Sequence, residues 1–175
     1  MPSYLLVLLA FVSRIVPHPW HFTAVGGSLL YFGARRPLRQ AVFPVALMAF
    51  SDYYLTAHVY SMQFRLGDYA LTWMWYAAAI VLGSILLKKA SVARVLSAVA
   101  LSSTSFFVVS NFAVWSHFGT YPHTLAGLIA CYVAALPFWP NEAMSTLLVT
   151  GLAFGLPAAA KQISEWRTGH NPAAS

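Results

Sequence analysis

The segment YALTWMWYAAAIVLGSILL, at residues 69–87, contains no charged residue. A helix rises about 1.5 Å per residue, so about 20 apolar residues cross a hydrocarbon core of ~30 Å. A segment of this length and composition is typical of a transmembrane helix. Six further apolar stretches lie on either side of it, at residues 4–16, 22–33, 41–60, 92–115, 124–139 and 143–160.

The composition of the whole chain excludes a water-soluble globule. Charged residues make up 8% of the 175 residues, against roughly 25% in ordinary soluble domains. The hydrophobic share of 59% also excludes a disordered chain, which is poor in apolar residues. We therefore expect an all-α, polytopic membrane helix bundle of about six transmembrane helices, within a range of roughly five to seven.

The first two apolar stretches are short, and Pro17 and Pro19 between them prevent one continuous helix. We expect a short or broken N-terminal pair, either two thin crossings or one interrupted element. Residues 1–162 are predicted to form a single transmembrane domain, and residues 163–175 a short polar C-terminal tail. The lone cysteine, Cys131, allows neither an internal disulfide nor a zinc-type motif.

Basic residues predict the orientation, because cytoplasmic loops of membrane proteins are enriched in Lys and Arg. They gather in two connections that an even number of crossings separates, at Arg35, Arg36, Arg39 and at Lys88, Lys89, Arg94. Both connections should face the cytoplasm, and those near residues 61–68 and 116–123 should face outward. We expect a multi-pass protein of the bacterial inner membrane. Because the cations form short clusters rather than one face, no nucleic-acid binding is expected.

Small residues predict one helix contact. Helices in lipid associate where small side chains let their backbones approach closely. Such residues recur every four positions in the last two apolar stretches, at Ala126, Ala130, Ala134 and at Gly151, Gly155, Ala159. These two helices are expected to pack tightly against each other.

Two polar residues inside apolar stretches are candidates for a binding site. Asp52 lies about two turns from the outer end of its stretch, and a carboxylate in a membrane should face the bundle interior or a cavity and have a partner. Asn111 lies at a similar depth on a helix rich in serine and threonine. The alternative is that Asn111 and the serines only bond neighbouring helices, at about 0.6 kcal/mol each.

Histidines and aromatic residues complete the candidate ligand site. His18 and His21 lie in the first turn, and Trp115, Tyr121 and His123 lie around the predicted outer loop. Imidazole and carboxylate groups could bind a metal ion such as Zn, Ni or Co, with His18, His21 and Asp52 as ligands. Alternatively, these side chains form the ordinary interfacial belt of membrane proteins.

Catalysis is not expected. The sequence has no GxSxG elbow, no HExxH helix and no Walker motif. His58 follows Asp52 by six residues, a spacing that does not place the two on one helical face as a metalloprotease requires. The protein is therefore predicted not to be an enzyme, and no cofactor is assigned.

Four segments carry a resemblance to a known family. They are RIVPHPWHFTAVGG (14–27), SDYYL (51–55), SNFAVW (110–115) and YPHTLAGLIACYVAALPFWPN (121–141). Together they resemble a family of functionally uncharacterised small bacterial membrane proteins, which is itself similar to the S components of energy-coupling-factor vitamin transporters. The second resemblance implies a bundle of about six helices with a vitamin or metal site near its outer face. It also implies a transmembrane coupling protein and ATPase subunits as partners.

The leading hypothesis is a substrate-binding membrane subunit of a transporter for a small, vitamin-like molecule or a metal ion. Its ligand-binding residues would be His18, His21, Asp52, Asn111, Trp115, Tyr121 and His123. The alternative hypothesis is a non-catalytic accessory subunit of a larger membrane complex, in which polar residues join helices and small residues form contact faces.

Overall fold

The computed structural model describes residues 1–16 and 22–169, with side chains as far as Trp166. Within these ranges the protein is all-α, as predicted. Its elements are α1 (Pro2–Ile15), α2 (Val25–Arg35), η1 (Leu38–Gln40), α3 (Val42–Tyr54), η2 (Leu55–Val59), α4 (Leu66–Leu86), α5 (Val92–His117), α6 (Leu125–Ala135), η3 (Leu136–Phe138) and α7 (Trp139–Gly169).

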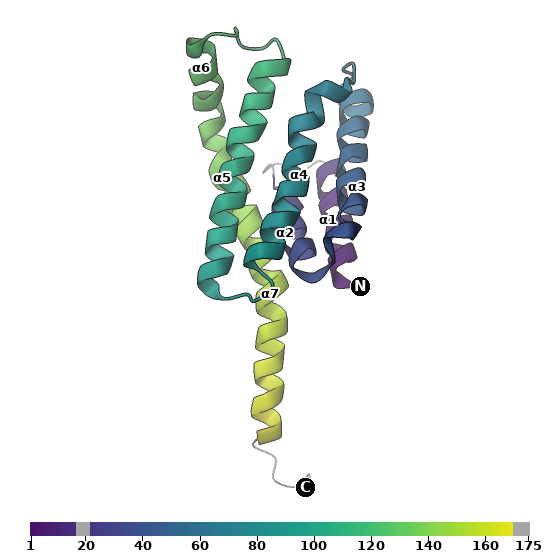
Figure 1. Ribbon diagram of the computed structural model, residues 1–175, viewed down its shortest axis with the longest axis vertical. Coiled ribbons are helices and arrows are strands. Elements are labelled where there is room, and N and C mark those ends of the chain that lie inside the picture. The colour runs from purple at the N-terminus through teal and green to yellow at the C-terminus, as the bar shows by residue number, and fades with distance from the viewer. Residues whose placement is uncertain (17–21, 170–175) are drawn as a thin grey trace.

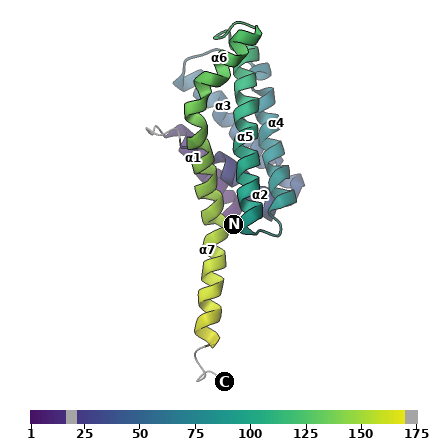
Figure 2. The same cartoon turned by 90° about the vertical axis from the view of Figure 1, so that its left-hand side faces the viewer.

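The helices lie side by side, and the chain runs alternately up and down the bundle from α1 to α6 (Figures 1 and 2). The N-terminus and the two basic connections, α2 to α3 and α4 to α5, lie at one end of the bundle, here called the basic end. His58, His117 and His123 lie in or beside the connections at the opposite end. The predicted grouping of the loops is therefore confirmed.

Three helical segments are long and apolar enough to cross a membrane: Leu66–Leu86, Val92–His117 and Leu125–Trp166. Of the other elements, α1 is apolar but has 14 residues, α2 has 11 and α3 has 13. The short N-terminal pair is thus confirmed in length. Length and composition thus support three crossings, and the predicted set of about six is not confirmed.

The predicted packing of the last two helices is wrong. Helices α6, η3 and α7 follow one another without a break and form one kinked rod rather than an antiparallel pair. The kink has a local cause, because Pro137 and Pro140 stand at the starts of η3 and α7. Proline has no backbone N–H, but the first N–H groups of a helix have no partner within the helix, so proline is tolerated there. A methyl group added at Gly151 or Gly155 would meet nothing within 4 Å.

The closest packing in the bundle instead joins α2 to α4. All residues of α2 from Val25 to Gly33 are buried, and α1, α4 and α7 all pack on this helix. A Cβ atom on Gly33 would lie 1.8 Å from the carbonyl oxygen of Ile80, and one on Gly83 would lie 2.1 Å from that of Leu30. Only glycine allows the two backbones to touch here, so these residues fix the crossing near the basic end.

Candidate functional site: a cavity at the end opposite the basic loops

The short N-terminal helices leave space inside the bundle. Figure 1 shows that α1 and α2 stop part-way along the bundle, whereas α4 and α5 continue past them. A cavity of about 710 Å³ lies in this region, with the last turn of α1, Thr23 and the start of α2 on one side. Helices α3, α4, α5 and α7 contribute the rest of the wall, and Tyr60, Asp68 and Phe118 place it at the end opposite the basic loops.

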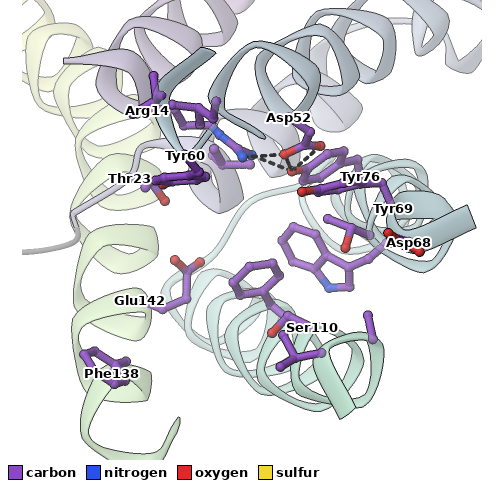
Figure 3. Close-up of a pocket in the computed structure, with 18 of the residues that line it drawn as sticks. Arg14, Thr23, Asp52, Tyr60, Asp68, Tyr69, Tyr76, Ser110, Phe138 and Glu142 are labelled. Atoms are coloured by element: carbon purple, nitrogen blue, oxygen red, sulfur yellow. Dashed lines mark hydrogen bonds and ion pairs between the residues drawn. The ribbon is translucent and has the colours of Figure 1, made fainter. Parts of the chain in front are cut away.

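An ion pair between Arg14 and Asp52 forms part of the wall (Figure 3). Arg14 Nη2 donates to Asp52 Oδ1 over 2.5 Å, and Arg14 Nη1 donates to the hydroxyl oxygen of Tyr76. Trp73 Nε1 donates to Asp52 Oδ2 over 3.0 Å, while the Tyr76 hydroxyl lies 3.3 Å from the same oxygen. Asp52 is 3% exposed. Its charge is thus compensated by a guanidinium and its oxygens are bonded by three side chains.

Local helix structure places both partners of this pair. Arg14 lies in the last turn of α1, where a cation interacts favourably with the negative end of the helix dipole. Asp52 lies near the end of α3, just before the helix widens into the π-helical turn η2. Such turns interrupt the regular helix and are frequent at functional sites. Leu55 and Val59 of η2 also line the cavity.

A second carboxylate, Glu142, faces the cavity from α7. Figure 3 shows its side chain pointing into the space across from Arg14 and Asp52. The hydroxyl of Thr146, one turn later on α7, donates to Glu142 Oε1 over 2.9 Å. Gly26 of α2 makes room for this contact, because a Cβ atom there would lie 2.4 Å from Thr146 Oγ1. Among the described residues, no Lys, Arg or His lies within ion-pair distance of Glu142.

The cavity wall contains most of the acidic residues of a basic chain. The whole chain has ten Lys and Arg residues against four acidic residues, for a net charge of +6. Of the four carboxylates, three line the cavity, namely Asp52, Asp68 and Glu142, whereas Arg14 is the single lining Lys or Arg in the described residues. Arg14 is paired with Asp52, so Asp68 and Glu142 leave two further carboxyl groups on the wall without a second Lys or Arg among the described lining residues.

Aromatic rings supply much of the remaining wall. They come from α4, α5 and η3 and from the connections after η2 and α5, at Tyr60, Tyr69, Trp75, Tyr76, Phe106, Phe118 and Phe138. Trp75 is held in place by Phe106, with ring centroids 4.7 Å apart, and by a hydrogen bond from its Nε1 to Ser105 Oγ. Aromatic faces attract cations, and this attraction grows when the cation is desolvated.

Of the residues predicted from the sequence, Asp52 is the one seen on the cavity wall in the described part of the chain. Asn111 does not line it, because its Nδ2 donates to the Phe107 carbonyl on its own helix over 2.7 Å. The neighbouring Ser110 lines the cavity instead.

Trp115, Tyr121 and His123 lie together at the α5–α6 connection, away from the cavity lining. The rings of Trp115 and His123 are in contact, with centroids 5.5 Å apart, and Trp115 Nε1 donates to the Pro122 carbonyl. The structure therefore brings these three residues near one another but separates them from Asp52.

The predicted ligands His18 and His21 lie outside the described residues, so the proposed metal site with Asp52 stays a prediction. Within residues 1–16 and 22–169 there is no group of three or more His, Cys, Asp or Glu side chains suited to hold a metal ion. The oxygens of Asp52 are already bonded to Arg14, Trp73 and Tyr76.

Several cavity residues were not predicted. Arg14 is the only charged residue among the first 34, and it stands near the end of an apolar stretch. A charge there needs a partner, which was a signal that could have linked it to Asp52. Glu142 lies between two apolar stretches beside prolines, a pattern that suggests a connecting loop. No sequence signal indicated that it begins a helix facing a cavity.

Comparison with known proteins identifies a family over nearly the whole chain. Residues 2–168 match the model of a family of unknown function, DUF6580. No curated protein and no solved structure matches the chain. The match supports the resemblance to a family without an assigned function. It gives no link to the S components of energy-coupling-factor transporters. The chain belongs to the DUF6580 family.

Proposed function

We propose that the protein is an integral membrane protein that binds a small organic cation in the cavity lined by Arg14, Asp52 and Glu142. Insertion is supported by the three long apolar helices, the charged share of 8% and the two basic connections at one end. By the positive-inside rule the cavity then lies toward the outer face of a bacterial inner membrane.

The observation that carries the ligand class is the excess of carboxylates on the cavity wall. Three of the four acidic residues gather there in a chain that is otherwise basic. Arg14 compensates Asp52, so Glu142 is available to a ligand with a positive charge. The aromatic rings add a surface that favours an alkylated or aromatic ammonium over a strongly hydrated inorganic ion.

The size of the cavity also favours a small organic ligand. Small-molecule sites in proteins measure roughly 300–1,000 Å³, and they combine mostly apolar walls with a few polar groups. The cavity of about 710 Å³ falls in this range and exceeds what one metal ion occupies. We therefore favour a vitamin-sized organic molecule over the metal ion among the ligands considered from the sequence.

In this proposal the protein is the substrate-binding subunit of a transporter. The sequence has no nucleotide-binding motif, so transport would be driven by a transmembrane coupling protein with ATPase subunits, as the resemblance to S components implies. The competing proposal is an accessory subunit of a larger membrane complex, for which the exposed small-residue face of α7 around Gly155 would be a contact surface.

The test begins with native mass spectrometry and elemental analysis of the protein purified alone in mild detergent from its host. We expect an organic adduct and no stoichiometric metal. Phenyltrimethylammonium and its uncharged isostere tert-butylbenzene are then compared as added ligands. Preference for the charged probe by about tenfold or more supports the proposal, since the attraction of a desolvated cation to aromatic rings contributes about 2 kcal/mol. Equal binding of the two probes contradicts it.

A separate outcome decides between the two roles. A chain that is isolated with larger membrane partners, and that binds neither probe, supports the accessory-subunit proposal. A chain that carries one equivalent of metal would instead support the metal-ion hypothesis with His18 and His21 as ligands.

A further inference from the structure

A second cavity lies at the basic end, between the C-terminal ends of α2 and α4. It measures about 310 Å³ and is lined by Ala34, Arg35, Arg36, Pro37, Leu38, Ser84 and Lys88. Three of these seven residues are cationic and none is acidic. Leu38 is 48% exposed and adds an apolar side chain at the edge of the cavity.

The helix crossing fixes the backbone around this cavity. Gly33 and Gly83, which bring α2 and α4 into backbone contact, are close in sequence to Arg35 and Ser84 of the lining. Close packing of this kind leaves the two helix ends little freedom to separate. The cavity is therefore a preformed feature of the fold.

Aromatic rings hold the two guanidinium groups. Arg35 Cζ lies 5.1 Å from the centroid of Phe154 and 5.6 Å from that of Tyr31, and Arg36 Cζ lies 4.8 Å from that of Tyr4. A guanidinium that stacks on a ring keeps its N–H groups, which point outward in the guanidinium plane, for an anion. The two arginines are thus positioned without an acidic partner.

One donor of a lining residue is not satisfied within the described residues. Arg36 Nε is buried and has no hydrogen-bond partner in the described part of the chain. No acidic side chain of the described residues remains for these cations either, because three of the four line the other cavity and Glu165 lies beside Lys161. A buried donor without an acceptor is costly, so an acceptor from outside the chain is expected.

We propose that this second cavity binds the phosphate of an anionic phospholipid headgroup in the leaflet at the basic end. Arginine forks match phosphate oxygens in a bidentate manner, and lysine adds a point charge. Basic pockets between transmembrane helices on the cytoplasmic side bind such headgroups, and Leu38 would contact the start of an acyl chain. The proposal rests on membrane insertion but not on the ligand of the larger cavity.

The test uses short-chain phosphatidylglycerol, short-chain phosphatidylcholine and inorganic phosphate as probes. Each is added to the full chain in an uncharged detergent, and binding is measured by native mass spectrometry and by thermal stabilisation. Without a bilayer the diffuse surface potential is absent, so direct contacts dominate. We expect saturable binding of phosphatidylglycerol, and Lys88→Gln with Arg36→Gln should weaken it by about a hundredfold, because each substitution removes a charge-assisted contact.

The matched control is the pair Arg39→Gln and Lys89→Gln, which removes two cations at the same end that do not line the cavity. It should leave phosphatidylglycerol binding nearly unchanged. Since Arg36 stacks on Tyr4, the single variant Lys88→Gln provides a second test that does not depend on that contact. It should weaken binding by about tenfold.

Three results would overturn the proposal. Equal losses in the lining pair and the control pair would indicate diffuse attraction to basic residues. Equal binding of phosphatidylcholine would exclude recognition of the anionic charge, and inorganic phosphate that binds as tightly as phosphatidylglycerol would assign the cavity to free phosphate. None of these results tests the proposed cation site at Glu142. A chain that stays soluble without detergent would contradict membrane insertion, on which both proposals rest.

Discussion

The two ends of the bundle are built in opposite ways. At the basic end, α2 and α4 touch backbone to backbone through Gly33 and Gly83. At the other end, α1 and α2 stop short, and a cavity of about 710 Å³ lies where their continuation would be. One end is held by close packing, and the other depends on a network of charged and polar side chains.

The difference extends to charge. The carboxylates Asp52, Asp68 and Glu142 line the cavity, whereas Arg35, Arg36 and Lys88 line a smaller cavity at the basic end. In a chain with four acidic residues this separation leaves few ion pairs, and the described residues contain two, of which Arg14–Asp52 is buried. The comparison indicates that the ends have separate tasks, and it can be tested one end at a time.

The largest effect is expected from breaking the ion pair at the cavity end. Asp52→Ala leaves Arg14 without its partner, and removing one member of a buried pair costs about 3–5 kcal/mol. Chemical unfolding in detergent measures this loss. The double variant Arg14→Met, Asp52→Leu should recover most of it, because an apolar pair needs no compensation. A double variant that is as unstable as the single one would show that the pair is not the source.

A slightly smaller effect is expected at the basic end. Gly33→Ala places a methyl group on the backbone of α4, and overpacking of this kind costs about 1–3 kcal/mol. The same unfolding measurement checks it. Gly155→Ala is the matched control, since its new methyl group meets nothing within 4 Å. If both variants are equally stable, close α2–α4 contact does not hold this end.

Tyr76→Phe tests whether the Tyr76 hydroxyl belongs to the network around Arg14 and Asp52. It removes the hydroxyl that bonds Arg14 and Asp52 but keeps the buried ring, so a loss of about 1 kcal/mol is expected. The double-mutant cycle with Asp52→Ala should show coupling, because the two residues share partners. Additive effects would place Tyr76 outside the network.

The smallest effect is expected from Asn111→Ala. The side chain bonds its own helix and does not line the cavity, so binding of an organic cation should stay within about twofold of the wild-type value. The sequence hypothesis placed Asn111 in the site and expects a large loss instead. Titration of phenyltrimethylammonium with both proteins decides between the two assignments.

The helices could be predicted from the sequence, but their contacts could not. Each of the seven apolar stretches contains most of one α-helix, since the apolar residues that fill a lipid-facing helix are visible in the sequence. The last two apolar stretches form one continuous rod, because Pro137 and Pro140 are tolerated at helix starts and kink the rod without reversing it. The expected packing of the last two helices against each other was therefore wrong.

Site residues were harder to predict for a related reason. Asp52 was identified because a lone carboxylate in an apolar stretch requires a partner. Arg14 lies 38 positions earlier, and which helices face each other depends on rotations that the sequence does not specify. Glu142 appeared to belong to a loop, so its position on the cavity wall became visible only from the course of α7.

The most direct test of the central claim is to measure phenyltrimethylammonium binding to Glu142→Gln and Glu165→Gln in parallel with the wild type. Both substitutions remove one carboxylate from α7, but only Glu142 lines the cavity. We predict that Glu142→Gln binds about tenfold or more weakly with unchanged stability, because the ammonium loses the attraction of a nearby carboxylate, and that Glu165→Gln binds like the wild type. Equal affinity of the two variants would contradict an organic-cation site at Glu142.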